Sequence, residues 1–233
     1  MSESTALGSE QLLRNEKVIP PEPSLSSTGS GFVVTQDGHL LTNSHVVKDC
    51  KVVQVRRADG EVTDARVVAT SPRDDLALLK VPQRQTTVAT FRGGRPVKQG
   101  EGVTVYGFPL TGLLASTGNL TFGHITALSG PHDDARLLQI SAAVQQGNSG
   151  GPVLDSGGNV VAMIVSKLDA LAVAGATGDM PQNINFAIKA SVATNFLEAR
   201  GISYAIPVPS PDLAASNIAD RARAITMRVD CLK

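Results

Sequence analysis

Short apolar runs rich in β-branched residues, separated by tight-turn signals, recur along most of the chain. The dipeptides Asp37-Gly38 and Asp59-Gly60 each stand between two such runs. Asp-Gly pairs in this position are typical of two-residue hairpin loops between antiparallel strands. This repetition of short strands and turns predicts an all-β fold of the barrel type. Strands are expected at residues 31–35, 39–42, 52–55, 62–69, 76–81, 102–108, 123–128, 137–142, 153–154, 160–165 and 185–188.

The composition fits such a fold and argues against several classes of function. The 233 residues are 42 % hydrophobic but only 3 % aromatic and include no Trp, so the core must consist of Val, Leu, Ile and Ala. The 21 basic residues balance 21 acidic ones, and no basic stripe with interleaved aromatics indicates a nucleic-acid partner. No window of 18 apolar residues is present, so no membrane-spanning segment is expected.

The two ends of the chain have different patterns. Residues 1–28 are polar and rich in serine, and we expect them to form a flexible lead-in. A helix is expected at 191–200, because its apolar residues share one face and a glycine follows. Ser210-Pro211 predicts the start of a second helix that continues to about residue 222. The run 225–231 alternates enough to predict a final edge strand.

The segment 146–152, Gln-Gly-Asn-Ser-Gly-Gly-Pro, has the properties of a nucleophile loop. A serine hydroxyl becomes a useful nucleophile only when a base removes its proton and donors stabilise the oxyanion that forms. Ser149 is the expected nucleophile, and Gly147, Asn148 and Ser149 are expected to form the oxyanion hole, with the N–H groups of Gly147 and Ser149 as donors. A Gly-rich turn between two strands is the alternative.

Candidates for the base and its carboxylate partner lie upstream. His45 directly follows a strand-like run, and Asp74 and Asp75 stand at the start of the apolar run 76–81. Asp75 is the better partner for the histidine, because it abuts the apolar run and should be more buried, whereas Asp74 is expected to be a solvated turn residue. The order His, Asp, Ser is that of chymotrypsin-like double barrels, while subtilisins and α/β-hydrolases use other orders.

The chain resembles a trypsin-like serine protease of the HtrA (Deg) branch. The resemblance implies an all-β, chymotrypsin-like double six-stranded β-barrel with C-terminal helices. The protease domain would cover residues 29–203, with a boundary between the barrels near 92–100, and a helix and strand in 204–233 would pack on it. The segments that carry the resemblance are 29–34, 41–47, 75–80, 142–144, 147–152 and 185–188.

The same resemblance implies an activity. It indicates a serine endopeptidase that cleaves polypeptides through an acyl-enzyme, with His45, Asp75 and Ser149 as its catalytic triad. Two alternatives stay open on sequence grounds. The first is a catalytically silent peptide-binding or scaffolding module on the same fold, and the second is an esterase or another acyl-transfer enzyme.

No cofactor or metal ion is expected. His39, His124 and His132 have no Cys, Asp or Glu at the spacing of metal ligands. His124 falls on a predicted strand, where we expect it to pack. The glycine-rich segments 29–31 and 107–109 do not open a helix after a strand, as nucleotide-binding loops do.

Three departures from the family pattern affect the interpretation. Digestive relatives keep an Asp before the nucleophile, which pairs with a new N-terminal amine, but this chain has Asn148. Activation by a cleaved N-terminus is therefore not expected. The chain leaves no room for a PDZ domain after the protease, so PDZ-driven substrate delivery is not expected either. Residues 1–31 contain no aromatic residue of the kind that joins HtrA trimers, which favours a monomer.

The expected specificity pocket is lined by Ala143, Val144, Ser166 and Lys167. Ala143 stands six residues before Ser149, where enzymes that prefer Lys or Arg place an Asp. Without an acid there, a basic substrate side chain would be buried unpaired, so small or medium apolar residues are expected to be preferred. Lys167 is expected to be exposed; if it turned inward, acidic residues could be accepted.

The two cysteines are expected to pair, Cys50 with Cys231, because some bacterial trypsin-like relatives are similar in having a cysteine after the histidine and another near the chain end. Two unrelated buried thiols are the alternative. A bridge across roughly 180 residues stabilises by about 4–5 kcal/mol in the chain-entropy model. It would imply an oxidising compartment, so a periplasmic or secreted location is expected, although the N-terminus has no signal-peptide pattern.

Overall fold

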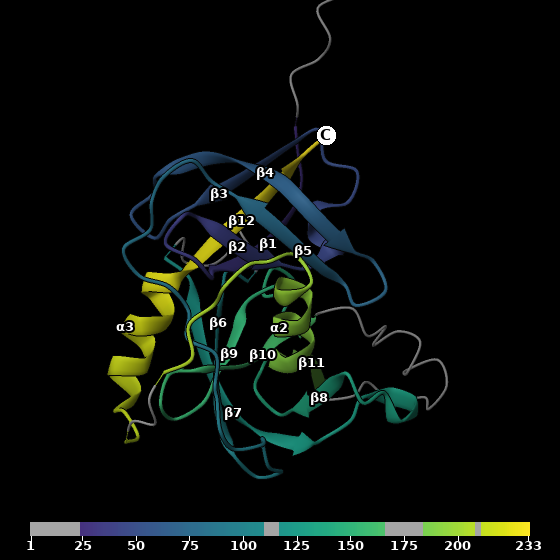
Figure 1. Ribbon diagram of the computed structural model, residues 1–233, viewed down its shortest axis with the longest axis vertical. Helices are drawn as coiled ribbons and strands as arrows, with labels where there is room; N and C mark the ends of the chain where they lie inside the picture. The colour runs from purple at the N-terminus through teal and green to yellow at the C-terminus, as the bar shows by residue number, and fades with distance from the viewer. Residues whose placement is uncertain (1–23, 110–116, 166–183, 208–210) are drawn as a thin grey trace, which may run out of the picture.

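Two closed barrels of six antiparallel strands make up most of the structure, a computed structural model that describes residues 24–109, 117–165, 184–207 and 211–233 (Figure 1). In Figure 1 the first barrel occupies the upper part of the view and the second barrel the lower part. Residues 81–101 connect them. This architecture confirms the chymotrypsin-like double barrel expected from the sequence.

The first barrel closes in the order β1-β12-β3-β4-β5-β2. Its inward-facing residues alternate along the strands, as in β3, where Val53 and Val55 are buried and their neighbours are half-buried. They form a core of aliphatic side chains inside the barrel. The strands are β1 (Leu25–Val33), β2 (His39–Thr42), β3 (Val52–Arg56), β4 (Val62–Ser71), β5 (Leu76–Lys80) and β12 (Thr226–Leu232).

The second barrel closes in the order β10-β11-β8-β7-β6-β9 around a similar aliphatic core. Its strands are β6 (Gly102–Gly107), β7 (Asn119–Ala127), β8 (Leu137–Ile140), β9 (Pro152–Leu154), β10 (Val160–Val165) and β11 (Asn185–Lys189). The helical segments are η1 (Ser44–Val47), η2 (Pro131–Asp133), α2 (Ala190–Glu198) and α3 (Ala215–Ile225).

A third apolar cluster joins the two barrels and the helices. It contains Phe32 of the first barrel, Met163 of the second, Phe196 of α2 and Ile218 of α3, all buried. The helices therefore cover apolar surface that neither barrel encloses by itself. Because both barrels contribute to one core, the loops that meet between them are held in a fixed relation.

The C-terminal strand β12 is one of the six strands of the first barrel. The expectation that it would be an edge strand was wrong. It pairs with β1 on one side and with β3 on the other. The side chains of Met227 and Val229 are buried in the barrel core. Figure 1 shows α3 leading from the level of the second barrel up into β12. The first barrel is therefore closed by a strand from the far end of the chain.

Several element boundaries also differ from expectation, among them the start of β7, which lies at Asn119 rather than at residue 123. Residues 25–28 are part of β1, although a flexible lead-in was expected there. Three of the four are Ser or Thr, which gave no strand pattern, and β12 supplies their backbone partners. Hydrogen bonds in both directions between Ser24 and Lys233 extend this pairing. Helix α3 begins at Ala215 rather than near residue 211, and Ser210 lies outside the described residues.

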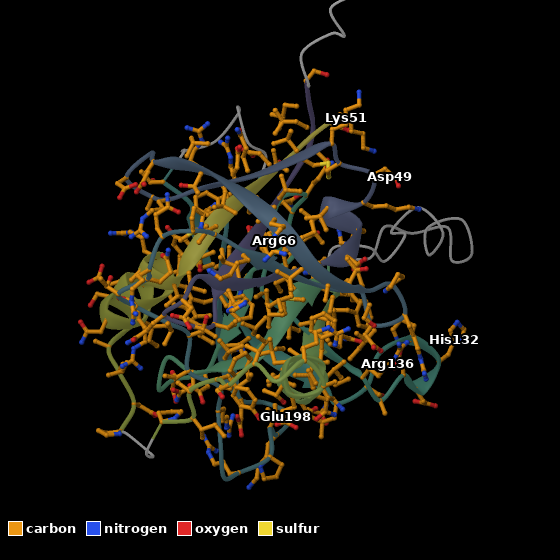
Figure 2. All side chains as sticks on the ribbon, turned by 45° about the horizontal axis from the view of Figure 1, so that its top comes forward. Asp49, Lys51, Arg66, His132, Arg136 and Glu198 are labelled. Carbon is orange, nitrogen blue, oxygen red and sulfur yellow. A yellow bond between two sulfur atoms is a disulfide. The ribbon has the colours of Figure 1, made fainter. Side chains whose placement is uncertain are left out.

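A disulfide joins Cys50 to Cys231, which confirms the predicted pairing. The two Cα atoms are 5.4 Å apart, within the usual range for a disulfide. The bridge links the segment that follows η1 to β12. Figure 2 shows Asp49 and Lys51, the neighbours of Cys50, at the end of the molecule where the disulfide lies. Among the described residues, no helix has the length and apolar character needed to cross a membrane.

Candidate active site

His45 and Asp75 form a hydrogen-bonded pair in the first barrel. β2 ends at Thr42, and η1 then carries His45, while Asp75 precedes β5, the strand that pairs with β2. The Asp75 carboxylate accepts one hydrogen bond from the backbone N–H of His45, at 2.9 Å. Its second oxygen lies 2.7 Å from Nδ1 of the His45 ring. One carboxylate therefore fixes both the backbone and the ring of the histidine.

The backbone of Asp75 strengthens the link between the two turns. Its carbonyl accepts hydrogen bonds from the N–H of Ser44, at 3.1 Å, and from Nδ2 of Asn43, at 2.9 Å. Asp75 has a φ of 52°, in the left-handed region that Asp tolerates better than most residues. Strained residues of this kind persist where the surrounding structure over-determines them. The hydrogen bonds around Asp75 provide that constraint.

Asp74 has other partners. Its carboxylate accepts hydrogen bonds from Oγ of Ser71, at 2.9 Å, and from the guanidinium of Arg136, at 3.2 Å. Arg136 also donates to the backbone carbonyl of Arg73, at 2.7 Å, and its hydrogen bonds to Asp134 hold the pKa of that carboxyl below its usual range. Asp74 thus bonds to Arg136 of the second barrel, whereas Asp75 bonds to His45.

Ser149 lies in a tight turn of the second barrel and is 5 % exposed. Gly147 in the same turn has a φ of 100°, which favours glycine. The N–H groups of Asn148, Gly150 and Gly151 donate to the carbonyls of Gln145, Ile164 and Asn148, respectively. Within the part of the chain that the structure describes, the N–H groups of Gly147 and Ser149 donate to no acceptor. The turn therefore leaves free the two donors that the sequence singled out.

Asn148, the third residue of the expected oxyanion hole, has its backbone N–H engaged within the turn, which agrees with Gly147 and Ser149 as the expected donors. Its N–H points to the carbonyl of Gln145, 3.0 Å away. Its carbonyl accepts from Gly151, at 2.9 Å. The backbone of Asn148 thus shapes the turn. Sequence spacing could not show this, because neighbouring N–H groups in a turn point in different directions.

The serine turn packs directly on the segment that leads to the histidine. A Cβ atom at Gly150 would lie 2.1 Å from the carbonyl oxygen of Ser30, 2.6 Å from Oγ1 of Thr42 and 3.1 Å from the backbone N of Asn43. Gly150 also has a φ of 85°. Only glycine meets both conditions, so Gly150 lets the two turns approach each other closely.

A cleft of about 520 Å³ opens beside His45 and Asp75. Its walls come from both barrels and from α2, and include Arg136 and Val192. Ser149 is not among its described lining residues, so the cleft lies on the histidine side of the site. It provides room for a part of a substrate next to the imidazole.

The residues expected to form the specificity pocket are only partly described. Ala143 is exposed, and its carbonyl accepts a hydrogen bond from Oγ1 of Thr121, at 2.9 Å. Val144 is half-buried and packs against the core of the second barrel. Ser166 and Lys167 lie outside the described residues. Of the four residues expected there, the structure thus describes Ala143 and Val144.

The other histidines stand apart from this site. His39 bonds through its ring to Thr35, and burial lowers its pKa. His124 is exposed on β7, which corrects its expected packing role. His132 extends away from the body of the molecule (Figure 2). Among the described residues no three His, Cys, Asp or Glu side chains are grouped as metal ligands.

Comparison with known proteins identifies the family. The trypsin-like peptidase domain family matches residues 29–163, more than half of the chain. The uncharacterized protein y4bJ of Sinorhizobium fredii is 45 % identical over 212 residues, which cover 91 % of this chain and 33 % of that protein. A probable periplasmic serine endoprotease, DegP-like, of Rhizobium meliloti is 40 % identical over 73 % of this chain and 32 % of its own length. The chain thus spans about a third of these curated relatives.

Solved structures agree with these relatives. The serine endoprotease from Yersinia pestis superposes with a TM-score of 0.60 at 28 % identity, over 74 % of this chain and 57 % of that chain. The HtrA-type protease AlgW with decapeptide gives a TM-score of 0.61 at 27 % identity, over 73 % and 50 %. With the family match and the double barrel, these similarities show that the chain belongs to the trypsin-like peptidase domain family, in its HtrA (Deg) branch.

Proposed function

We propose that the chain is a serine endopeptidase in which His45 is the general base, Asp75 orients it and Ser149 is the nucleophile. The observation that supports this most strongly is the Asp75 carboxylate, which bonds both the backbone N–H and ring Nδ1 of His45. Because Nδ1 is engaged, Nε2 is the nitrogen that can exchange a proton with substrate or nucleophile. A merely structural histidine would not need both hydrogen bonds.

The reaction would proceed in two halves. The Ser149 hydroxyl attacks the peptide carbonyl while His45 accepts its proton, and the negative charge of Asp75 stabilises the imidazolium that results. The free N–H groups of Gly147 and Ser149 stabilise the oxyanion. His45 then gives its proton to the leaving amine, and an acyl group remains on Ser149. Water, activated by His45, releases the acyl group in the second half.

Substrate class and location follow from the same features and from the relatives. A polypeptide is the expected substrate, because the relative from Rhizobium meliloti is named a serine endoprotease. That relative is also named periplasmic. The Cys50–Cys231 bridge agrees with such a location, since disulfides persist in oxidising compartments. We place the chain in the periplasm or outside the cell.

Incubation of the full chain with casein is expected to release peptides cut after Val, Ala or Leu rather than after Lys or Arg. Ala143 offers no counter-charge to a basic side chain, and burial of an unpaired cation costs several kcal/mol. Mass spectrometry of the product termini gives the profile. Cleavage mainly after Lys or Arg would place the pocket base elsewhere, and an absence of products would contradict the endopeptidase. A Ser149→Ala chain purified in parallel identifies cuts made by contaminants.

A further inference from the structure

Ser30 lies at the contact between the two barrels and is fully buried on β1. Its N–H donates to the carbonyl of Ser149, at 2.8 Å, and its hydroxyl donates to the carbonyl of Gly147, also at 2.8 Å. The same hydroxyl accepts from the N–H of Phe108, at 3.0 Å. Thr42 in turn donates from Oγ1 to the Ser30 carbonyl, at 2.7 Å. One residue of the first barrel therefore binds the serine turn of the second at two points.

These two points lie on either side of the free donor of Ser149. The carbonyl of Gly147 shares a peptide plane with the N–H of Asn148, and the carbonyl of Ser149 shares one with the N–H of Gly150. Ser30 fixes both planes. The plane between them carries the Ser149 N–H, and its carbonyl is bonded to Gly151. Three successive peptides are thus fixed, and the middle one presents a free N–H.

The side chain of Ser30 matters most at Gly147. Glycine lacks a Cβ, so its own dihedral preferences do not confine the following peptide. Among the described residues, the hydroxyl of Ser30 is the donor that the Gly147 carbonyl binds. Without it, this peptide keeps only the bond from the Asn148 N–H to the carbonyl of Gln145, and it can tilt and carry the neighbouring N–H groups away from the position that an oxyanion would occupy. Preorganised donors stabilise charge because they need no reorientation during the reaction.

We propose that Ser30 is a positioning residue that sets the oxyanion hole of Gly147 and Ser149, and that Thr42 fixes Ser30 in turn. The inference rests on the proposed function, because it assigns the hole to the same serine turn. Thr42 ends β2, and Asn43 leads from it to η1, which carries His45. Hydrogen bonds through Thr42 and Ser30 therefore connect the base-bearing turn with the donor-bearing turn. The alignment of base, nucleophile and hole then depends on two hydroxyls of the first barrel.

Three variants test this assignment. Ser30→Ala removes the hydroxyl without adding bulk, and Thr42→Val removes the donor to Ser30 while keeping the shape of the side chain. Thr226→Val is the matched control, because Thr226 is equally buried and donates to the carbonyl of Ala222 at the same 2.7 Å, away from the serine turn. Two readouts are measured: kcat and KM on a fluorogenic peptide, and residue-resolved amide hydrogen exchange.

Ser30→Ala is expected to lower kcat by about 10- to 100-fold and to leave KM within about twofold of that of the unchanged chain. Removal of one oxyanion donor typically lowers kcat by about 100- to 1,000-fold. The effect should be smaller here, because the donor is displaced and not removed. Thr42→Val should lower kcat by less, and Thr226→Val should leave it unchanged. Exchange at the amides of Asn148 and Gly150 should accelerate in Ser30→Ala and not in Thr226→Val.

Peptide hydrolysis and amide exchange together distinguish a failure of the proposed endopeptidase function from a failure of the role assigned to Ser30. If the unchanged chain hydrolyses no peptide, the proposed function fails, while accelerated exchange in Ser30→Ala alone still supports the positioning of the turn. Equal kcat in the unchanged chain and Ser30→Ala would overturn the inference and leave the endopeptidase intact. Exchange that accelerates to the same extent in Ser30→Ala and Thr226→Val would overturn it too, because it would show general loosening of the fold.

Discussion

Replacement of Ser149 by alanine is expected to lower peptide turnover about a millionfold while both barrels stay folded. The substitution removes one oxygen from a nearly buried side chain and none of the backbone hydrogen bonds that shape its turn. With the nucleophile gone, His45 has no hydroxyl to activate. Turnover of a fluorogenic peptide measures the loss of activity. Thermal unfolding, measured on the same preparation, shows whether both barrels stay folded.

Ser156→Ala is the matched control for this loss. Ser156 also lies in the second barrel, and its hydroxyl bonds to the exposed Asp212 rather than to the active-site turn. We expect its turnover to stay within about twofold of that of the unchanged chain. Turnover of Ser149→Ala within about tenfold of the unchanged chain would remove Ser149 from the mechanism.

Val229→Asp is expected to destabilise the chain by about 3–5 kcal/mol, because a carboxylate would be buried without a partner inside the first barrel. Val229 is 0 % exposed on β12, between β1 and β3. If the side chain at position 229 faced solvent, the same change would be tolerated. Urea unfolding monitored by circular dichroism measures the difference in the free energy of unfolding.

Val67→Asp controls for the introduced charge and for the low strand propensity of Asp. Val67 lies within β4 of the same barrel, pairs with Leu79 and is 38 % exposed. The free energy of unfolding should fall by less than about 1 kcal/mol in Val67→Asp. Similar losses in the two variants would contradict the place of β12 in the barrel core.

Local patterns in the sequence predicted most of the strands and the choice of Asp75 as the partner of His45. Asp75 was preferred to Asp74 because it adjoins an apolar run, and in the structure its carboxylate bonds His45 while Asp74 bonds Arg136. The cysteine pairing came from the family resemblance, and the disulfide is present. These features depend on residues that are close in sequence or on recognisable motifs.

Pairing between distant segments could not be predicted in the same way. Alternation in β12 indicated a strand, but period alone does not say that β1 and β3 are its neighbours. Residues 25–28 gave no strand signal because three of the four are Ser or Thr and their backbone partners come from β12. Ser30 was visible only as part of a glycine-rich motif, since its role lies in hydrogen bonds to carbonyls far along the chain.

A fluorophosphonate probe tests the central claim, that His45 and Asp75 activate Ser149, most directly. The probe reacts with a serine only when that serine is activated as a nucleophile. The full chain is treated with the probe, digested and analysed by tandem mass spectrometry, and the His45→Ala chain is treated in parallel. We predict a single adduct on Ser149 that is lost in the His45→Ala chain. An unlabelled chain, an adduct on another serine, or equal labelling of Ser149 without His45 would contradict the account.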